Sequence, residues 1–292
     1  MKQLFDNVSH EMSALTTKRY STSFSLGISF LANDLHKPIY AVYGFVRFAD
    51  EIVDSFHDFN KSELLADFTR QTYEAIEKGI SLNPILNSFQ WAVNKYQIPL
   101  ELIQTFLNSM EMDLDKQAYD HSKYQTYILG SAEVVGLMCL KIFVRGDHNE
   151  YERLKAPAMK LGAAFQKINF LRDLRADFHE LGRTYFPGVD LAQFNATVKK
   201  EIEKEIAHDF HEGYLGIKQL PKDARFGVYM AYIYYYKLFK KIQNTPAETI
   251  LNERIRIPDN KKYRLFLTSY LRHNLNLLYH RHLRLPCMEL FV

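Results

Sequence analysis

The sequence predicts an all-α protein, and three observations lead to that prediction. Apolar residues recur at helical spacing along most of the 292 residues. Glycine and proline, with 12 and 9 copies, are sparse for a chain of this length. No Asn-Gly turn joins two alternating apolar runs, as a β-hairpin would require. Because the chain also lacks an internal repeat and a low-complexity linker, we expect a single helical domain over residues 1–292.

Several helix boundaries are marked by capping residues. Asn83 and Pro84 match an N-cap followed by the first helical residue, Gly79 ends the helix before them, and Pro38 suits a first turn after a turn at residues 33–34. The expected helices cover 1–19, 20–31, 38–56, 61–79, 85–96, 99–114, 124–144, 150–178, 197–218 and 221–243, then a short segment at 246–258 and a basic amphipathic helix at 261–285.

Composition excludes several kinds of partner and site. The formal charge of +3, without Lys/Arg runs interleaved with aromatic residues, argues against nucleic acid. Cys139 and Cys287 lack disulfide-framework or zinc-ligand spacing, which fits a reducing cytoplasm. The polar N-terminus does not resemble a signal peptide, and no uninterrupted apolar run reaches the ~18–20 residues that span a bilayer. The 14% aromatic content suits a large apolar cavity as well as an ordinary core.

The helix expected around Tyr40–Phe56 carries two acids on one face. Asp50 and Asp54 lie four residues apart, and Tyr43 and Arg47 fall on the same side. The remaining positions are mostly apolar, so these carboxylates need a cation, a metal or a basic partner if the helix is buried. Taken alone, this pattern fits a solvated acidic stripe on an amphipathic helix equally well.

A second polar stripe lies in the long helix expected at 150–178. It comprises Gln166, Asn169, Asp173 and Asp177, at i, i+3, i+7 and i+11. If the two acidic helices face each other, four carboxylates form a negative pocket that suits a Mg²⁺-bridged diphosphate. Four arginines are available to hold phosphate oxygens: Arg47, Arg172, Arg183 and Arg254. The plainer alternative is that Arg172 and Arg175 simply pair with these acids.

Together these motifs resemble the squalene/phytoene synthase family, the head-to-head trans-prenyl transferases, from about Ser21 to Lys262. The order of the motifs also agrees with that family. The matching residues are Ser21, Ser23 and Phe24; Tyr43, Arg47, Asp50 and Asp54; Met110 to Leu114; Tyr127; Gln166, Asn169, Arg172, Asp173 and Asp177; Gly182 to Pro187; Tyr235; and Arg254.

The resemblance implies an isoprenoid-synthase-like helical bundle around a central cavity, and it implies roles for individual residues. The expected Mg²⁺ ligands, which Mn²⁺ could also occupy, are Asp50, Asp54, Asn169, Asp173 and Asp177. The expected catalytic residues are the four aspartates with Tyr43, Arg47 and Tyr127. The expected substrate-binding residues are Ser21, Ser23, Phe24, Gln166, Asn169, Arg172, Arg183, Tyr235 and Arg254.

Two segments depart from the family pattern. The first aspartate motif has Ala49 and Glu51 around Asp50, although its acidic pair is kept. The segment after Tyr127 has Glu133 at an apolar position, where it either faces a basic residue outside the cavity or tunes the site. Gly130 and Gly136 inside the same expected helix indicate close packing or close approach of a ligand.

The function implied is that of a phytoene synthase in carotenoid biosynthesis. Two geranylgeranyl diphosphates (C20) condense through a cyclopropylcarbinyl diphosphate, prephytoene diphosphate, to phytoene with release of diphosphate, and no NADPH is expected. Gly27 and Ile28, which are not aromatic, favour the longer substrate. The alternatives are a squalene or dehydrosqualene synthase that joins two farnesyl diphosphates (C15), and a non-catalytic assembly protein of the same fold.

Membrane contact is expected to be peripheral and transient, on the inner face of the membrane, because substrates and product are lipids. The tail at 261–285 has the apolar and basic residues of an interfacial helix, but a closing helix packed on the bundle is the favoured interpretation. The oligomeric state is left open by the sequence.

Overall fold

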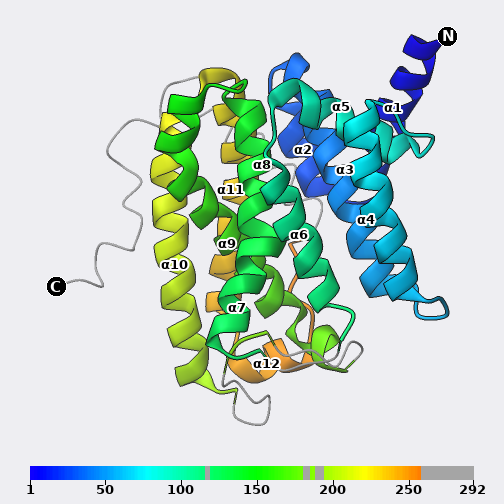
Figure 1. Cartoon of the computed structure of the whole chain (residues 1–292). Helices are drawn as coiled ribbons and strands as arrows, with labels where there is room; N and C mark the ends of the chain where they lie inside the picture. Colours follow the sequence, from blue (N-terminus) through cyan, green and yellow to red (C-terminus); the bar gives the residue numbers. More distant parts are fainter. Residues whose placement is uncertain (116–118, 180–184, 188–193, 258–292) are drawn as a thin grey trace.

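Helices account for all regular structure in the residues that the computed structural model describes, 1–115, 119–179, 185–187 and 194–257 (Figure 1). This confirms the all-α prediction. The helices are α1 (Lys2–Tyr20), α2 (Thr22–Ser29), α3 (Asn33–Ser55), α4 (Lys61–Lys78), α5 (Pro84–Tyr96), α6 (Leu100–Met112), α7 (His121–Ile128), a π-helix (Leu129–Glu133), α8 (Val134–Phe143), α9 (His148–His179), α10 (Ala196–Gln219), α11 (Lys222–Gln243) and α12 (Ala247–Asn252). The tail at 261–285 lies outside the described residues.

The predicted caps between α4 and α5 are confirmed. Gly79 follows α4 with φ +68°, in the left-handed region that glycine adopts without strain. The side chain of Asn83 accepts hydrogen bonds from the backbone N–H groups of Ile85 and Leu86, and Pro84 is the first helical residue.

The prediction of a turn at residues 33–34 was wrong, because α3 begins at Asn33, five residues before Pro38. The extended residue Ala32 anchors this earlier start. Its N–H donates to the Asp223 carbonyl at 2.9 Å, and its own carbonyl accepts from Leu35 N at 2.9 Å. Leu35 is fully buried, so core packing fixes the first turn despite the missing donor at Pro38.

The single helix predicted at 124–144 is instead three segments, α7, the π-helix and α8. The wider π turn falls at Gly130, where a Cβ atom would lie 2.5 Å from the Ser109 Cβ and 2.7 Å from the Thr105 carbonyl of α6. At Gly136 a Cβ would lie 3.1 Å from the Ala158 carbonyl of α9. Close helix packing, the first of the two expected reasons, therefore explains both glycines.

This stretch, His121–Phe143, is the one part of the described chain that is long and apolar enough to cross a membrane, with a mean hydropathy of 1.5. The expectation that no segment qualifies rested on uninterrupted apolar runs, and Glu133 and Lys141 interrupt this one. Its apolar character has another physical role here, since 56% of the window is buried inside the bundle.

Two apolar clusters flank the centre of the bundle. In the first, Phe45, Phe89 and Phe106 from α3, α5 and α6 are fully buried, and the Phe45 and Phe89 rings stack with centroids 3.8 Å apart. The second lies among α9, α10 and α11, where Phe210 stacks on Phe239 at 5.5 Å. The long helix α9 runs between the two groups of helices (Figure 1).

Helix α1 packs through a polar face. His10 is buried, and its Nδ1 lies 2.9 Å from the Ser88 hydroxyl of α5. Next to it, Asn87 donates to the Ser9 hydroxyl and to the Asp6 carboxylate, each at 3.1 Å. These hydrogen bonds satisfy side chains that would otherwise be costly to bury.

We predict that stability falls as the pH drops below about 6.5, because burial, and secondarily the charge on Lys37, lower the pKa of His10. The unfolded chain then binds a proton that the folded chain resists, so stability is complete above the ordinary histidine pKa and is lost below it. His10→Gln, which keeps a hydrogen-bonding side chain, should flatten this dependence. Thermal unfolding from pH 5 to 8 measures it, and equal slopes in wild type, His10→Gln and the exposed control His208→Gln would contradict the prediction.

Candidate active site

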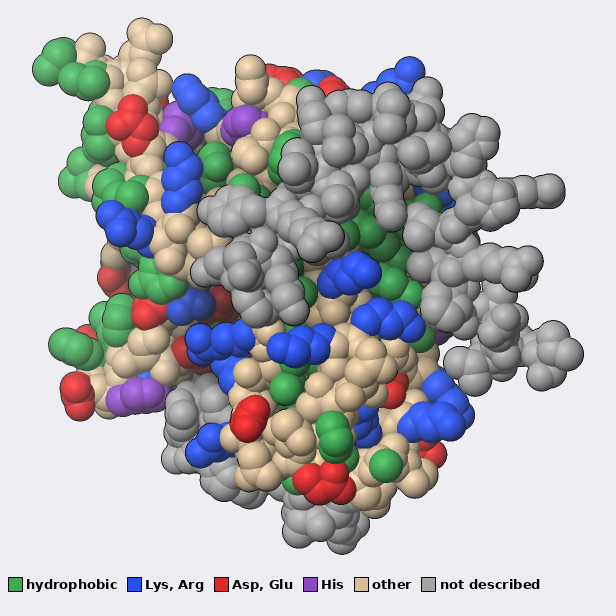
Figure 2. Space-filling view, turned by 180° about the vertical axis from the view of Figure 1, so that it is seen from behind, with side chains coloured by type: hydrophobic (Ala, Val, Ile, Leu, Met, Phe, Trp, Pro, Cys, Tyr) green, Lys and Arg blue, Asp and Glu red, His purple; other side chains and the backbone are tan. Residues whose placement is uncertain are grey.

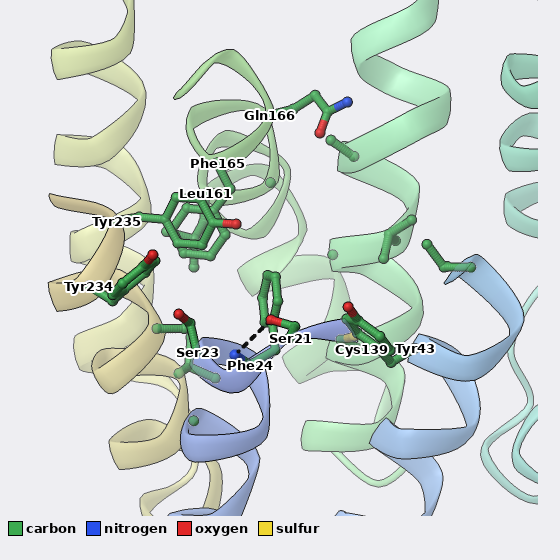
Figure 3. Close-up of a pocket in the computed structure, with 18 of the residues that line it drawn as sticks. Ser21, Ser23, Phe24, Tyr43, Cys139, Leu161, Phe165, Gln166, Tyr234 and Tyr235 are labelled. Atoms are coloured by element: carbon green, nitrogen blue, oxygen red, sulfur yellow. Dashed lines mark hydrogen bonds between the residues drawn. The ribbon is translucent and has the colours of Figure 1, made fainter. Parts of the chain in front are cut away.

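A cavity of about 940 Å³ opens between α2, α3, the π-helix, α8, α9 and α11 (Figure 3). Most of the residues that the sequence singled out meet there, although they span more than 200 positions of the chain. The predicted site residues that line it are Ser21, Ser23, Phe24, Tyr43, Arg47, Asp50, Tyr127, Gln166, Asn169, Arg172, Tyr235 and Arg254.

The cavity is long and has one polar and one apolar end. Along α9, its lining runs from Leu154 to Arg172, which corresponds to ~27 Å of helix. Along α3, the lining runs from the apolar Ile39 to the acidic Asp50, so the apolar end again comes first in the sequence. Gly136 of α8 packs on Ala158 of α9, and Ala132 of the π-helix packs on Gly162, one turn further along α9. The two helices therefore run in opposite directions, and the apolar end of α8 lies beside the apolar end of α9.

The start of α2 is shaped by Ser21. This residue is extended, which breaks the chain direction after α1, and its hydroxyl accepts a hydrogen bond from Phe24 N at 3.2 Å (Figure 3). The cap places Ser23 and Phe24 at the cavity, and the Phe24 ring lies 5.8 Å from Tyr43 and 5.9 Å from Tyr235. The single helix predicted at 20–31 is thus shorter, with its first residues serving as cap and cavity wall.

Asp50 is the acid of the first stripe that lines the cavity, while Asp54, one turn further, is half-buried beside it. Burial, and then the charge of Asp54, raise the pKa of Asp50 to about 8. Arg47 does not pair with Asp50: its Nε donates to Glu51 at 3.1 Å, and its guanidinium stacks on the Tyr20 ring at 4.4 Å. Burial and the neighbouring acids thus disfavour the charged form of the Asp50 carboxyl, and a cation beside it would favour that form.

In the second stripe, the basic partners that the sequence offered are engaged. Arg172 Nε lies 3.1 Å from both oxygens of Asp173, and Arg254 Nε lies 2.6 Å from Asp173 Oδ1. Arg175, the other candidate partner, donates instead to the Asn252 carbonyl at 2.7 Å. Burial opposes the charge on Arg172, but its pairing with Asp173 raises its pKa overall.

The predicted pocket of four carboxylates remains a prediction. Among the described side chains, no group of three His, Cys, Asp or Glu residues is close enough to hold a metal ion. The side chain of Asp177 and the whole of Arg183 lie outside the described part of the chain. Asp173 does not line the cavity but reaches it through Arg172 and Arg254, which do.

Asp113 contacts a residue of the cavity wall, Tyr127, and the sequence reasoning left it without a role. It follows α6, is only 5% exposed, and accepts hydrogen bonds from the hydroxyls of Tyr127 at 2.6 Å and Tyr185 at 3.4 Å. Burial and the nearby Asp113 charge raise the pKa of Tyr127, and Asp113 also contributes to the raised pKa of Asp50. Two features of the sequence could have indicated this role: Asp113 is a carboxylate at the end of an apolar helix, and it belongs to the matching motif Met110 to Leu114.

Aromatic rings cover the walls beside the polar end. Phe165 stacks on Tyr235 with centroids 4.1 Å apart, and Figure 3 shows both beside Leu161. Tyr235 also donates from its hydroxyl to Asn169 Oδ1 at 3.4 Å, and Asn169 Nδ2 donates to Gln166 Oε1 at 3.3 Å. Such faces can stabilise positive charge in a space with little water. The sequence reasoning did not single out Phe165, which only its place one residue before Gln166 could have suggested.

Glu133 lies behind the cavity wall rather than in it. Burial raises its pKa, and the nearest opposing charges are Lys160 and Lys167 of α9. Lys167 is itself buried and ion-paired with Asp209 of α10 at 2.6 Å. These contacts support the first alternative for Glu133, a charge that faces basic residues outside the cavity.

We predict that Asp113→Ala lowers the free energy of unfolding by about 1–3 kcal/mol, because the hydroxyls of Tyr127 and Tyr185 lose a buried acceptor. Asp113→Asn, which retains an acceptor oxygen, should lose less. Urea unfolding of the two variants and of the exposed control Asp67→Ala measures the difference. Equal stability of Asp113→Ala and wild type would show that these hydroxyls find other partners.

Comparison with known proteins identifies the family to which this fold belongs. The squalene/phytoene synthase family matches residues 17–261. The phytoene synthase of Arthrospira platensis is 24% identical over 279 residues, covering 87% of this chain and 90% of its own length. The 4,4'-diapophytoene synthase of Staphylococcus haemolyticus is 27% identical over 201 residues, covering 66% of this chain and 67% of its own length.

Solved structures agree with the fold. The crystal structure of a dehydrosqualene synthase in complex with ligand superposes with a TM-score of 0.75 at 21% identity, over 92% of this chain and 98% of its own. A squalene synthase from Alicyclobacillus acidocaldarius superposes with a TM-score of 0.71 at 22% identity, over 82% of this chain and 94% of its own. With the family match over most of its length and the predicted residues gathered around one cavity, the chain belongs to the squalene/phytoene synthase family and is a prenyltransferase.

Proposed function

We propose that this prenyltransferase is a Mg²⁺-dependent phytoene synthase, which condenses two geranylgeranyl diphosphates head to head in carotenoid biosynthesis. The observation that carries the proposal is the division of one long cavity into a polar end at Asp50 and Arg172 and an apolar end beyond Ile39. Diphosphates and prenyl tails require those two environments. A relative named phytoene synthase that aligns over 87% of the chain supports the choice of product.

At the polar end, the diphosphate groups would meet both acids and bases of the chain. Asp50 and Asp54, with Asn169, Asp173 and Asp177, are the oxygen donors that would hold Mg²⁺, which neutralises a diphosphate leaving group when bound. Arg172 and Arg254 line the cavity and can turn from Asp173 to phosphate oxygens. Asp173 would then be released as these two guanidiniums change partner.

In the chemical step, one substrate loses its diphosphate and the other's double bond captures the allylic cation. Loss of a proton closes the cyclopropane ring of prephytoene diphosphate, and a second ionisation with rearrangement and proton loss gives phytoene. Phe24, Phe165 and Tyr235 line the cavity, where their rings would stabilise positive charge, and the surrounding apolar wall would exclude water that quenches the cation. The acceptor of the protons would be the departing diphosphate, Gln166 or a tyrosine hydroxyl, and Gln166 and Tyr235 line the cavity.

Small and aliphatic residues on α2 support the longer substrate. Gly27 and Ile28 line the cavity, and a Cβ on Gly27 would meet nothing closer than the Gly227 carbonyl at 3.4 Å. An aromatic ring at either position would shorten the space for a tail. The alternative is C15 coupling, which the diapophytoene synthase among the relatives favours.

We expect Asp50→Asn and Asp54→Asn each to lower turnover by about 10²–10³ or more, because a neutral amide cannot balance a metal–diphosphate centre. Far-UV circular dichroism should remain that of the wild type. Diphosphate release with Mg²⁺ titration measures the effect, and the exposed Asp67→Asn serves as control. Near-normal turnover in both site variants would contradict the metal-site assignment, and absence of release in the wild type would favour the non-catalytic alternative.

We expect the wild type to couple labelled C20 diphosphate in preference to C15 diphosphate, without NADPH. Ile28→Phe should lower kcat/KM for the C20 substrate relative to C15 by about tenfold, since the added ring occupies tail space. Competition between the two labelled substrates, followed by chromatography of the products, measures both effects. Preferential C15 coupling by the wild type would replace phytoene by dehydrosqualene or squalene as the product.

A further inference from the structure

Helix α1 is amphipathic in the opposite sense to an ordinary surface helix. Its large apolar side chains point to solvent: Leu4 is 61% exposed, Val8 45%, Met12 40% and Leu15 49%. Their spacing of four, four and three residues places them in one row along the helix. We refer to these four residues as the α1 stripe. Soluble helices normally turn such a row towards the core.

The orientation of α1 is fixed by its opposite, polar face. Ser9, His10, Ser13 and Thr17 are buried, and His10 and Ser9 are hydrogen-bonded to α5. Ser13 sits against Gly44 of α3, where a Cβ atom would lie 3.1 Å from its hydroxyl oxygen. Rolling α1 to bury the stripe would break these contacts, so the exposed apolar row is built into the fold.

Basic side chains border the C-terminal end of the stripe. Lys18 and Arg19, in the last turn of α1, are exposed and follow Leu15 by three and four residues. The acidic residues of α1 offset this positive charge only in part. Asp6 is paired with Lys2 at 2.7 Å, which leaves Glu11 as the exposed acid. An apolar row with a cationic border matches the chemistry of an anionic lipid surface.

The C-terminal end of α1 reaches the cavity. Helix α1 ends at Tyr20, which is 51% exposed, and Tyr20 with the next residue, Ser21, lines the cavity. Figure 1 shows the N-terminal half of α1 projecting beyond the bundle, and Figure 2 shows hydrophobic side chains projecting at that same end of the molecule. A surface bound along α1 would therefore lie beside the Tyr20 edge of the cavity.

We propose that the α1 stripe is a lipid-docking surface, which seats in the interface of an anionic bilayer with Lys18 and Arg19 among the headgroups. Docking there brings the Tyr20 edge of the cavity to the membrane. This inference goes beyond the proposed reaction and rests on the surface of α1 alone, so it is tested without substrate.

The test measures binding of the full chain to vesicles of phosphatidylcholine and phosphatidylglycerol in a ratio of about 7:3. Leu4→Gln/Leu15→Gln should lower the partition coefficient by about tenfold or more, because two leucines no longer enter the interface. The matched control Leu64→Gln/Leu100→Gln, with two exposed leucines on α4 and α6, should stay within about twofold of wild type.

A second variant tests the charged border. Lys18→Glu/Arg19→Glu should lower binding to the anionic vesicles by about tenfold or more, with little change on vesicles of phosphatidylcholine alone. Circular dichroism and thermal unfolding of each variant verify the fold, and diphosphate release in detergent reports the reaction separately.

Several results would overturn the proposal. Wild-type binding by Leu4→Gln/Leu15→Gln would do so, as would an equal loss in the control pair or no binding by the wild type. If Leu4→Gln/Leu15→Gln binds vesicles as the wild type does but has a lower particle mass than the wild type in light scattering, the stripe is occupied by a second copy of the chain. If this variant binds vesicles as the wild type does but melts at a lower temperature than the wild type, the stripe is covered by another segment of this chain.

Discussion

The architecture depends on one electrostatic constraint: an acid, Asp50, must be kept at the edge of an apolar cavity. Burial and the neighbouring acids raise its pKa to about 8, and its nearest arginine on the same helix is held by Glu51 and Tyr20. Two other bases of the cavity wall already have partners. Arg172 and Arg254 are both ion-paired with Asp173. A site built this way suits an anionic ligand, and the proposed Mg²⁺ would accompany that ligand.

The sequence was sufficient for the fold class and for most of the cavity. Helical periodicity and caps such as Asn83–Pro84 are local signals, so they can be recognised without knowledge of the tertiary structure. Twelve of the predicted site residues line the cavity, and the motifs of α3 and α9 each occupy one face of one helix. Their convergence, however, was inferred from the resemblance to a family rather than from spacing, since nothing local says which helices face each other.

The features that sequence reasoning missed all depend on contacts between helices. The π turn at Gly130 follows from the approach of α6, and the early start of α3 follows from a hydrogen bond between Ala32 and Asp223. Asp113 acquires its role only when Tyr127 and Tyr185 donate to it. The outward apolar row of α1 had the right period for an ordinary helix, and periodicity does not say which face is inside.

The polar attachment of α1 has a consequence for the motions of the protein. Helix α1 is fixed by hydrogen bonds of Ser9, His10 and Asn87, and its leucines are already in solvent. It therefore exposes little buried apolar surface when it separates from the bundle. Its opening is therefore less costly than opening of α3 or α5, whose phenylalanines stack in the core, and its amides should exchange with solvent first. We therefore expect the N-terminal helix to open before the core helices, and any surface that binds it would reinforce its closure.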